Sequence, residues 1–91
     1  MSLYRKQRLE SVIQELLSKE VVRSVEFDRG LITVTGVGID EEHDKTIIQV
    51  SVYPDEYRKD ALIKLNAQAP KLAWFLLKKI RVKKIPTLVF K

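Results

Sequence analysis

The stretch Thr46–Tyr53, with the sequence TIIQVSVY, decides the fold because every second residue from Ile48 to Val52 is apolar. This period of two residues is typical of a strand that buries one face. Upstream, residues 31–39 have the sequence LITVTGVGI, whose β-branched residues predict a second strand. Only the polar segment of residues 40–45 separates the two strands, so we expect an antiparallel hairpin.

A helix is predicted before this hairpin. Apolar residues recur at three- and four-residue spacing from Leu9 to Leu17, which indicates an amphipathic helix over residues 4–20. The β-branched pair Val21 and Val22 favours the end of the helix at this point.

Two helices and a strand are predicted after the hairpin. Residues 55–68 have an apolar face, and Pro70 ends that helix because proline lacks an N–H and its ring clashes with the preceding turn. Proline can open a helix, so we expect a further helix over residues 70–80, joined to the previous one at a sharp bend. Residues 85–90 then predict a third strand, since Pro86 is tolerated at the start of a strand or on a sheet edge.

This order of elements predicts an α+β fold. The connection of some thirty residues between the last two strands is long enough for them to lie parallel. We therefore expect a mixed three-stranded sheet with helices packed on one face, in the order α-β-β-α-(kink)-α-β. A chain of 91 residues has room for one core, so we expect a single domain over residues 1–91.

Positive charge is concentrated in the last third of the chain. The net charge is +5, but residues 21–56 have a balance of −5 and residues 57–91 a balance of +9, with Asp60 as their only acid. Such a surface attracts polyanions, above all the phosphate backbone of nucleic acids. The alternative is a lysine-rich face that only keeps a small protein soluble. We favour nucleic-acid binding because the balance is so uneven.

Few residues offer catalytic or metal chemistry. The chain has no cysteine, which excludes disulfides, thiolate zinc sites and cysteine nucleophiles. Gly36 and Gly38 lack the third glycine of a dinucleotide fingerprint and precede a hairpin, so we expect a bulge or a close backbone approach there. His43 is the only histidine, and in a hairpin loop water replaces the partly dry cleft that acid–base catalysis needs. We expect no enzyme activity, no bound metal and no cofactor.

The sequence also predicts a cellular location. No run approaches the roughly 20 apolar residues of a membrane span, and the N-terminus lacks the apolar segment of a signal peptide. We therefore expect a cytoplasmic protein with no membrane partner.

Trp74 and Phe75 are adjacent on the last predicted helix and point about 100° apart, so we expect one of them to be partly exposed. Trp74 either covers the edge of the core beneath lysine or tyrosine side chains or, beside Lys71 and Lys78, stacks on an unpaired base.

Three segments spread over nearly the whole chain carry a family resemblance. They are Gln7-Arg8-Leu9, the stretch Gly30–Val37 (GLITVTGV) and the stretch Arg81–Phe90 (RVKKIPTLVF). They resemble the Q-R start, the T-V-T-G-V strand and the R-x-R/K-x-x-P-x-L-x-F pattern of the bacterial ribosome-binding factor A family. The slots of that family's kinked Ala-x-Gly fall here at Gln68 and Pro70.

This resemblance implies a type II KH-like fold, which binds RNA. It further implies an assembly factor for the small (30S) ribosomal subunit that contacts 16S ribosomal RNA and supports maturation of the 5′ end of that RNA. Members act alongside assembly GTPases and matter most in the cold. We expect a monomer.

The candidate RNA contacts are the cations of the last helix and the turn after it, extended by cations near the N-terminus: Lys71, Lys78, Lys79, Arg81, Lys83, Lys84, Arg5, Lys6 and Arg8. The alternative is a protein-interaction adaptor whose basic face meets an acidic protein and never touches RNA.

Overall fold

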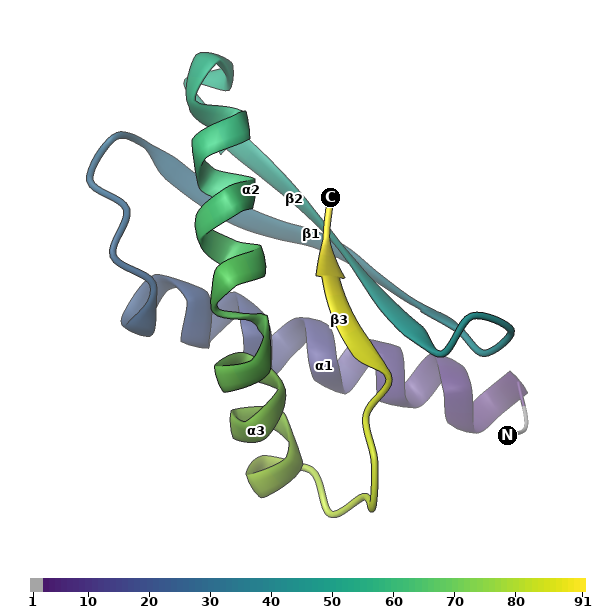
Figure 1. Cartoon of the computed structure of the whole chain (residues 1–91). Helices are drawn as coiled ribbons and strands as arrows, with labels where there is room; N and C mark the ends of the chain where they lie inside the picture. Colours follow the sequence, from purple (N-terminus) through teal and green to yellow (C-terminus); the bar gives the residue numbers. More distant parts are fainter. Residues whose placement is uncertain (1–2) are drawn as a thin grey trace.

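The strands and helices follow one another in the predicted order. The computed structural model describes residues 3–91. Its elements are α1 (Leu3–Ser24), β1 (Leu31–Asp40), β2 (Lys45–Tyr53), the short 3₁₀ helix η1 (Asp55–Tyr57), α2 (Arg58–Ala67), α3 (Ala69–Lys79) and β3 (Thr87–Phe90). The strands lie in the order β1-β2-β3, with β1 and β2 antiparallel and β2 and β3 parallel (Figure 1). The mixed three-stranded sheet is therefore confirmed.

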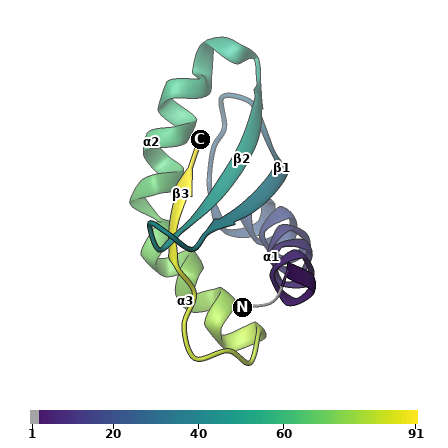
Figure 2. The ribbon, with the colours of Figure 1, turned by 90° about the vertical axis from the view of Figure 1, so that its right-hand side faces the viewer.

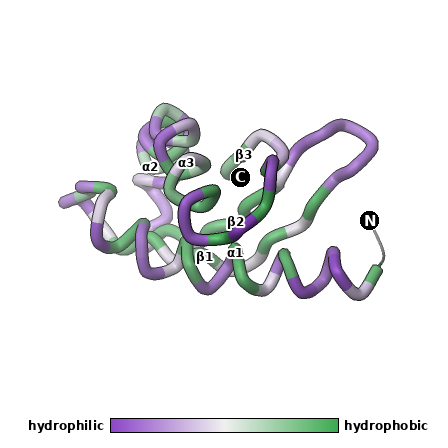
Figure 3. Tube along the Cα trace, turned by 90° about the horizontal axis from the view of Figure 1, so that it is seen from below, coloured by the Kyte–Doolittle hydropathy of each residue, from purple (hydrophilic) through white to green (hydrophobic). Residues whose placement is uncertain are grey.

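The helices cover one face of the sheet and leave the other open. Along β2, the side chains of Thr46, Ile48, Val50 and Val52 are buried, and the residues between them are half-buried or exposed. In Figure 2, α1 lies near β1 and the α2–α3 pair lies near β3. Figure 3 shows that hydrophilic residues gather in the loop between β1 and β2. Full burial of one aliphatic side chain stabilises the fold by about 1.5–3 kcal/mol. The buried residues of α1 are Ile13, Leu17 and Val21, and those of α3 are Ala69, Leu72 and Leu76.

The first helix is longer than predicted. α1 continues to Ser24, four residues beyond the expected end at residue 20. Val21 is only 2% exposed because it packs into the core, and this burial outweighs the modest helix penalty of a β-branched residue.

The bend between the last two helices is confirmed at Gln68. Its backbone angles, φ −95° and ψ 3°, depart from helical values, and it is the one residue between α2 and α3. The Gln68 N–H donates to the carbonyls of Lys64 and Leu65, while the Gln68 carbonyl accepts the N–H of Leu72. Pro70 lies in the first turn of α3, where its missing N–H removes no helical hydrogen bond.

The third strand is shorter than predicted, because β3 begins at Thr87 and not at residue 85. Pro86 has no N–H for the ladder, and its carbonyl accepts a hydrogen bond from the buried Thr46 hydroxyl at 3.0 Å. Ile85, 8% exposed, anchors the preceding turn in the core.

One of the two roles expected for the glycines of β1 is present. The register of β1 against β2 shifts between Val34 and Gly36, which is a β-bulge. A Cβ at Gly36 would meet only the Gln49 Cβ at 3.9 Å, and a Cβ at Gly38 would meet nothing within 4 Å. The close backbone approach therefore does not occur at either position.

The side chain of Asn66 holds the outer edge of β3. Its Oδ1 accepts the Phe90 N–H at 2.8 Å, and its Nδ2 donates to the Phe90 carbonyl at 3.1 Å. The amide thus takes the place of a neighbouring strand and fixes the end of α2 to the sheet.

Replacing Asn66 by alanine is expected to lower the free energy of unfolding by about 1–3 kcal/mol, because both polar groups of Phe90 lose their partner. Urea unfolding measures this change. Lys59→Ala, on the exposed side of the same helix, is the control and should change stability by less than about 0.5 kcal/mol. Equal stabilities of the two variants would contradict this role of Asn66.

Candidate nucleic-acid interface

A groove of about 390 Å³ lies between the C-terminal half of α1 and the outer face of α3. Trp74 is 62% exposed there, and Lys78 Nζ lies 4.3 Å from the centroid of the indole. Lys79 Nζ lies 6.0 Å from the Phe75 ring centroid. The groove is lined by Glu20, Arg23, Ser24, Gln68, Lys71, Leu72, Trp74, Phe75, Lys78 and Lys79.

The spacing of residues on α3 explains this arrangement. Lys71, Trp74 and Lys78 are three and four residues apart and therefore lie along one face of the helix. Leu72 is buried, and Trp74, two residues later, points about 200° away from it. Phe75 is the aromatic residue that packs against the core. The expectation that one of the two aromatic residues is partly exposed is therefore confirmed. The exposed residue is Trp74, and Lys78 Nζ lies over its ring.

α1 contributes an arginine that the sequence analysis missed. The Arg23 side chain is 78% exposed, and its Nε lies 3.4 Å from a carboxylate oxygen of Glu20. Glu20 also accepts a hydrogen bond from the Ser24 hydroxyl at 2.6 Å. Arg23 lies beyond the predicted end of the first helix, in a segment whose net charge is negative, so neither pattern singled it out.

The predicted cations after α3 divide into two kinds. Arg81 and Lys83 are exposed in the turn between α3 and β3. Lys84 Nζ lies 2.9 Å from Asp44 Oδ2 and thus ties this turn to the loop between β1 and β2. An exposed pair of this kind is worth at most about 1 kcal/mol.

The predicted N-terminal cations lie apart from the groove. Arg5, Lys6 and Arg8 occupy the first turns of α1, at the end of the molecule where the β1–β2 loop lies (Figure 1). Arg8 precedes Arg23 by fifteen residues, which is roughly 22 Å along the helix axis. The structure therefore does not bring these three residues together with the cations of α3.

Two other arginines serve the fold. Arg29 Nη1 lies 2.8 Å from Asp60 Oδ2, and its guanidinium carbon lies 5.9 Å from the centroid of the Tyr57 ring. Arg58 Nη1 donates to the Val50 carbonyl at 2.8 Å, next to the point where Val50 N–H pairs with the end of the chain. Both guanidinium groups thus have partners within the fold.

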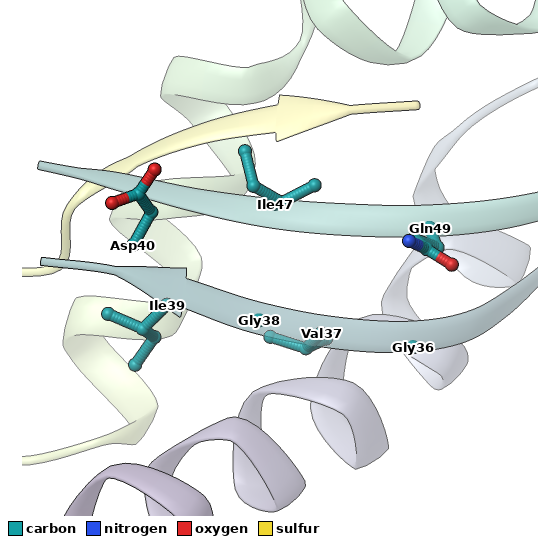
Figure 4. Close-up of a pocket in the computed structure, with 7 residues that line it drawn as sticks. All are labelled: Gly36, Val37, Gly38, Ile39, Asp40, Ile47 and Gln49. Atoms are coloured by element: carbon teal, nitrogen blue, oxygen red, sulfur yellow. The ribbon is translucent and has the colours of Figure 1, made fainter. Parts of the chain in front are cut away.

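The open face of the sheet has a groove of its own, of about 520 Å³ (Figure 4). Gly36 and Gly38 of β1 line this groove without a side chain, and Ile47 and Gln49 of β2 line it as well. Asp40 is its only charged residue, so this groove does not attract a polyanion. The residues drawn in Figure 4 are Gly36, Val37, Gly38, Ile39, Asp40, Ile47 and Gln49.

His43 forms a local contact in the β1–β2 loop. Its Nδ1 lies 2.8 Å from Asp40 Oδ2, and its backbone N–H donates to Asp40 Oδ1 at 3.2 Å. These hydrogen bonds, chiefly the one from the imidazole, hold the pKa of the Asp40 carboxyl below its ordinary value of 3.8. Within residues 3–91, no group of three His, Cys, Asp or Glu side chains is arranged to hold a metal ion.

His43→Ala is expected to raise the pKa of Asp40 part of the way towards 3.8, since the backbone N–H of residue 43 still donates. A carboxyl group whose pKa is lowered on folding stabilises the folded state at pH values above its ordinary pKa. This stabilisation is lost as the pH falls through the lowered pKa. The wild type and the variant should therefore converge in stability in strong acid. NMR titration of the Asp40 carboxyl carbon measures the shift, and an unchanged pKa would contradict the contact.

The sequence of this chain matches one protein family. The family model described as "Ribosome-binding factor A" matches residues 5–91. A search of curated proteins finds no significant match. Across residues 3–91, no helix is both long and apolar enough to cross a membrane.

Solved structures similar to this chain include two from Thermus thermophilus. The crystal structure of ribosome-binding factor A from this bacterium has a TM-score of 0.81 and 25% sequence identity, over 94% of this chain and 92% of that chain. A homology model of the T. thermophilus protein, fitted into a cryo-EM map of a 30S complex, has a TM-score of 0.78 and 25% identity, over 91% and 89%. A solution NMR structure of a Thermotoga maritima protein, described as a candidate ribosome binding factor A, has a TM-score of 0.78 and 26% identity, over 100% and 89%.

Proposed function

Because the chain belongs to the ribosome-binding factor A family, we propose that it binds 16S ribosomal RNA in the immature small subunit through one basic surface. This α3 basic surface consists of Lys71, Lys78, Lys79, Arg81 and Lys83, which are all exposed. The observation that carries the proposal is that none of these five cations forms an ion pair with a carboxylate of the described residues. Lys71, Lys78 and Lys79 line one groove, and cations placed close together can neutralise successive phosphates.

The other candidate residues have secondary places in this proposal. Lys84 lies at the border of the α3 basic surface, where its pairing with Asp44 competes with a phosphate. Arg5, Lys6 and Arg8 would form a second, separate contact at the far end of α1.

Further steps of the proposal are supported by the family and by the likeness to a protein fitted into a map of a 30S complex. We propose that binding supports maturation of the 5′ end of 16S RNA, alongside an assembly GTPase, in the cytoplasm. The chain would act as a monomer and as one KH-like unit, and it would contribute binding and no catalysis.

Co-sedimentation with purified precursor small-subunit particles tests the proposal. We expect the protein to sediment with the particles and to be released by added salt, with log affinity falling against log salt with a slope of roughly −2 to −4 for three to five phosphate contacts. Ribonuclease treatment should abolish the association. Association that survives ribonuclease would contradict RNA binding and would indicate an adaptor that binds an acidic protein.

A further inference from the structure

The indole of Trp74 is the starting point for a more specific site within the proposed RNA-binding function. Trp74 is 62% exposed, whereas its neighbour Phe75 packs against the core. An exposed indole offers a broad apolar face on which a nucleobase can stack, whatever the identity of the base. A surface that binds only phosphates does not need an exposed aromatic ring. The indole of Trp74 therefore points to a contact with a base.

The cations around the indole are placed for the phosphates on both sides of a stacked base. Lys71 precedes Trp74 by three residues and Lys78 follows it by four, so the two lysines flank the ring along one helix face. Lys78 Nζ lies over one face of the ring, 4.3 Å from its centroid, so a stacked base would use the other face of the indole. A nucleotide on Trp74 would therefore have a cation on either side.

Arg23 supplies the opposite wall of the groove. Its Nε contacts the Glu20 carboxylate, which is itself held by the Ser24 hydroxyl, so the guanidinium is positioned while its side chain stays 78% exposed. Glu20 is the only acid of the groove, and its side chain is 12% exposed, so the surface offered to a ligand is positive. The volume, about 390 Å³, lies at the small end of the range for ligand sites.

We infer that the groove between α1 and α3 binds one unpaired nucleotide of RNA, with its base stacked on Trp74 and its flanking phosphates held by Lys71, Lys78 and Arg23. The inference rests on the proposed RNA binding and adds the kind of RNA that is recognised. Bases within a duplex are stacked on each other and do not offer a face to the indole, so the site selects single-stranded segments, loops or bulges.

Trp74 is the only tryptophan of the chain, so its fluorescence reports on this site directly. The first experiment titrates the protein with a single-stranded oligonucleotide and with a blunt RNA duplex of the same length. We expect the single strand to quench the emission in a saturable manner and the duplex to leave it nearly unchanged. Equal quenching by the two RNAs, or no quenching by the single strand, would overturn the inference.

The second experiment measures the affinity of labelled single-stranded RNA by anisotropy at several salt concentrations. Trp74→Ala should weaken binding by about 5- to 150-fold without changing the slope of log affinity against log salt, because it removes stacking and no phosphate contact. Trp74→Phe should keep most of the affinity. Tyr53→Ala, which removes a 77% exposed aromatic side chain from the end of β2, is the control and should bind like the wild type.

These variants distinguish a failure of the stacking site from a failure of the proposed RNA binding. If Trp74→Ala binds single-stranded RNA as the wild type does while alanine substitutions of the α3 cations abolish binding, the stacking site is refuted and the proposed function stands. If the cation substitutions also leave binding intact, the proposed function itself fails.

Discussion

Replacing Lys78, Lys79, Arg81 and Lys83 together by alanine should lower the affinity of the protein for single-stranded RNA about a hundred- to a thousand-fold at 0.1 M salt. Each phosphate that a cation neutralises contributes about −0.7 to the slope of log affinity against log salt on single strands. Loss of three or four contacts should thus make the slope shallower by about 2 to 3. Anisotropy titrations of labelled RNA at several salt concentrations measure both quantities.

A matched control removes the same charge from elsewhere. Alanine at Lys19, Lys45, Lys59 and Lys91 also lowers the net charge from +5 to +1, but it leaves the α3 basic surface intact. All eight side chains are exposed, so both quadruple variants should keep nearly the wild-type thermal midpoint. If the control loses as much affinity as the test variant, the net charge of the protein drives binding and the α3 basic surface does not.

Gly30→Ala should strongly destabilise the folded protein. A Cβ at Gly30 would overlap the backbone carbonyl oxygen of Tyr53 and lie 3.2 Å from Pro54 Cδ. The carbonyl cannot simply move, because Tyr53 pairs with Leu31 at the end of the β1–β2 ladder. We expect a loss of about 1–3 kcal/mol or more, as in overpacked cores. At about 4–8 °C per kcal/mol, the thermal midpoint should fall by about 5–20 °C.

Gly38→Ala is the control for Gly30→Ala. The new methyl group at Gly38 meets nothing within 4 Å. Gly38, like Gly30, lies beside β2, where it pairs with Ile47. We expect a change of less than about 0.5 kcal/mol in urea and thermal unfolding. If Gly30→Ala unfolded at the same midpoint as Gly38→Ala, the steric account of Gly30 would be wrong.

Local sequence patterns predicted the elements of this fold, and tertiary packing set their ends. The alternation in β2 and the break at Pro70 depend on side-chain periodicity and backbone chemistry, which act within a few residues. The extension of α1 to Ser24 depends on the burial of Val21 by segments remote in the chain, and local propensity cannot contain that information. The edge contact of Asn66 with Phe90 likewise joins residues that only the fold brings together.

Local sequence patterns also predict the part of the candidate site that lies on α3, but not the part that α1 contributes. The cations of α3 were identified because they are neighbours in sequence and lie on one helix. Arg23 was missed because it reaches the groove only through the crossing of α1 and α3. Charge alone groups Arg5, Lys6 and Arg8 with the α3 cations, but the length of α1 places them away from the groove.

The parallel pairing of β2 and β3 also bears on how the protein folds. Thr46 pairs with Leu88, some forty residues later in the chain, whereas β1 and β2 are joined by a short loop. Contacts of such long sequence separation close a large loop and tend to form late. We therefore expect the hairpin to be structured in the folding transition state before β3 docks. Stopped-flow measurements on Asn66→Ala should accordingly show faster unfolding with a nearly unchanged folding rate.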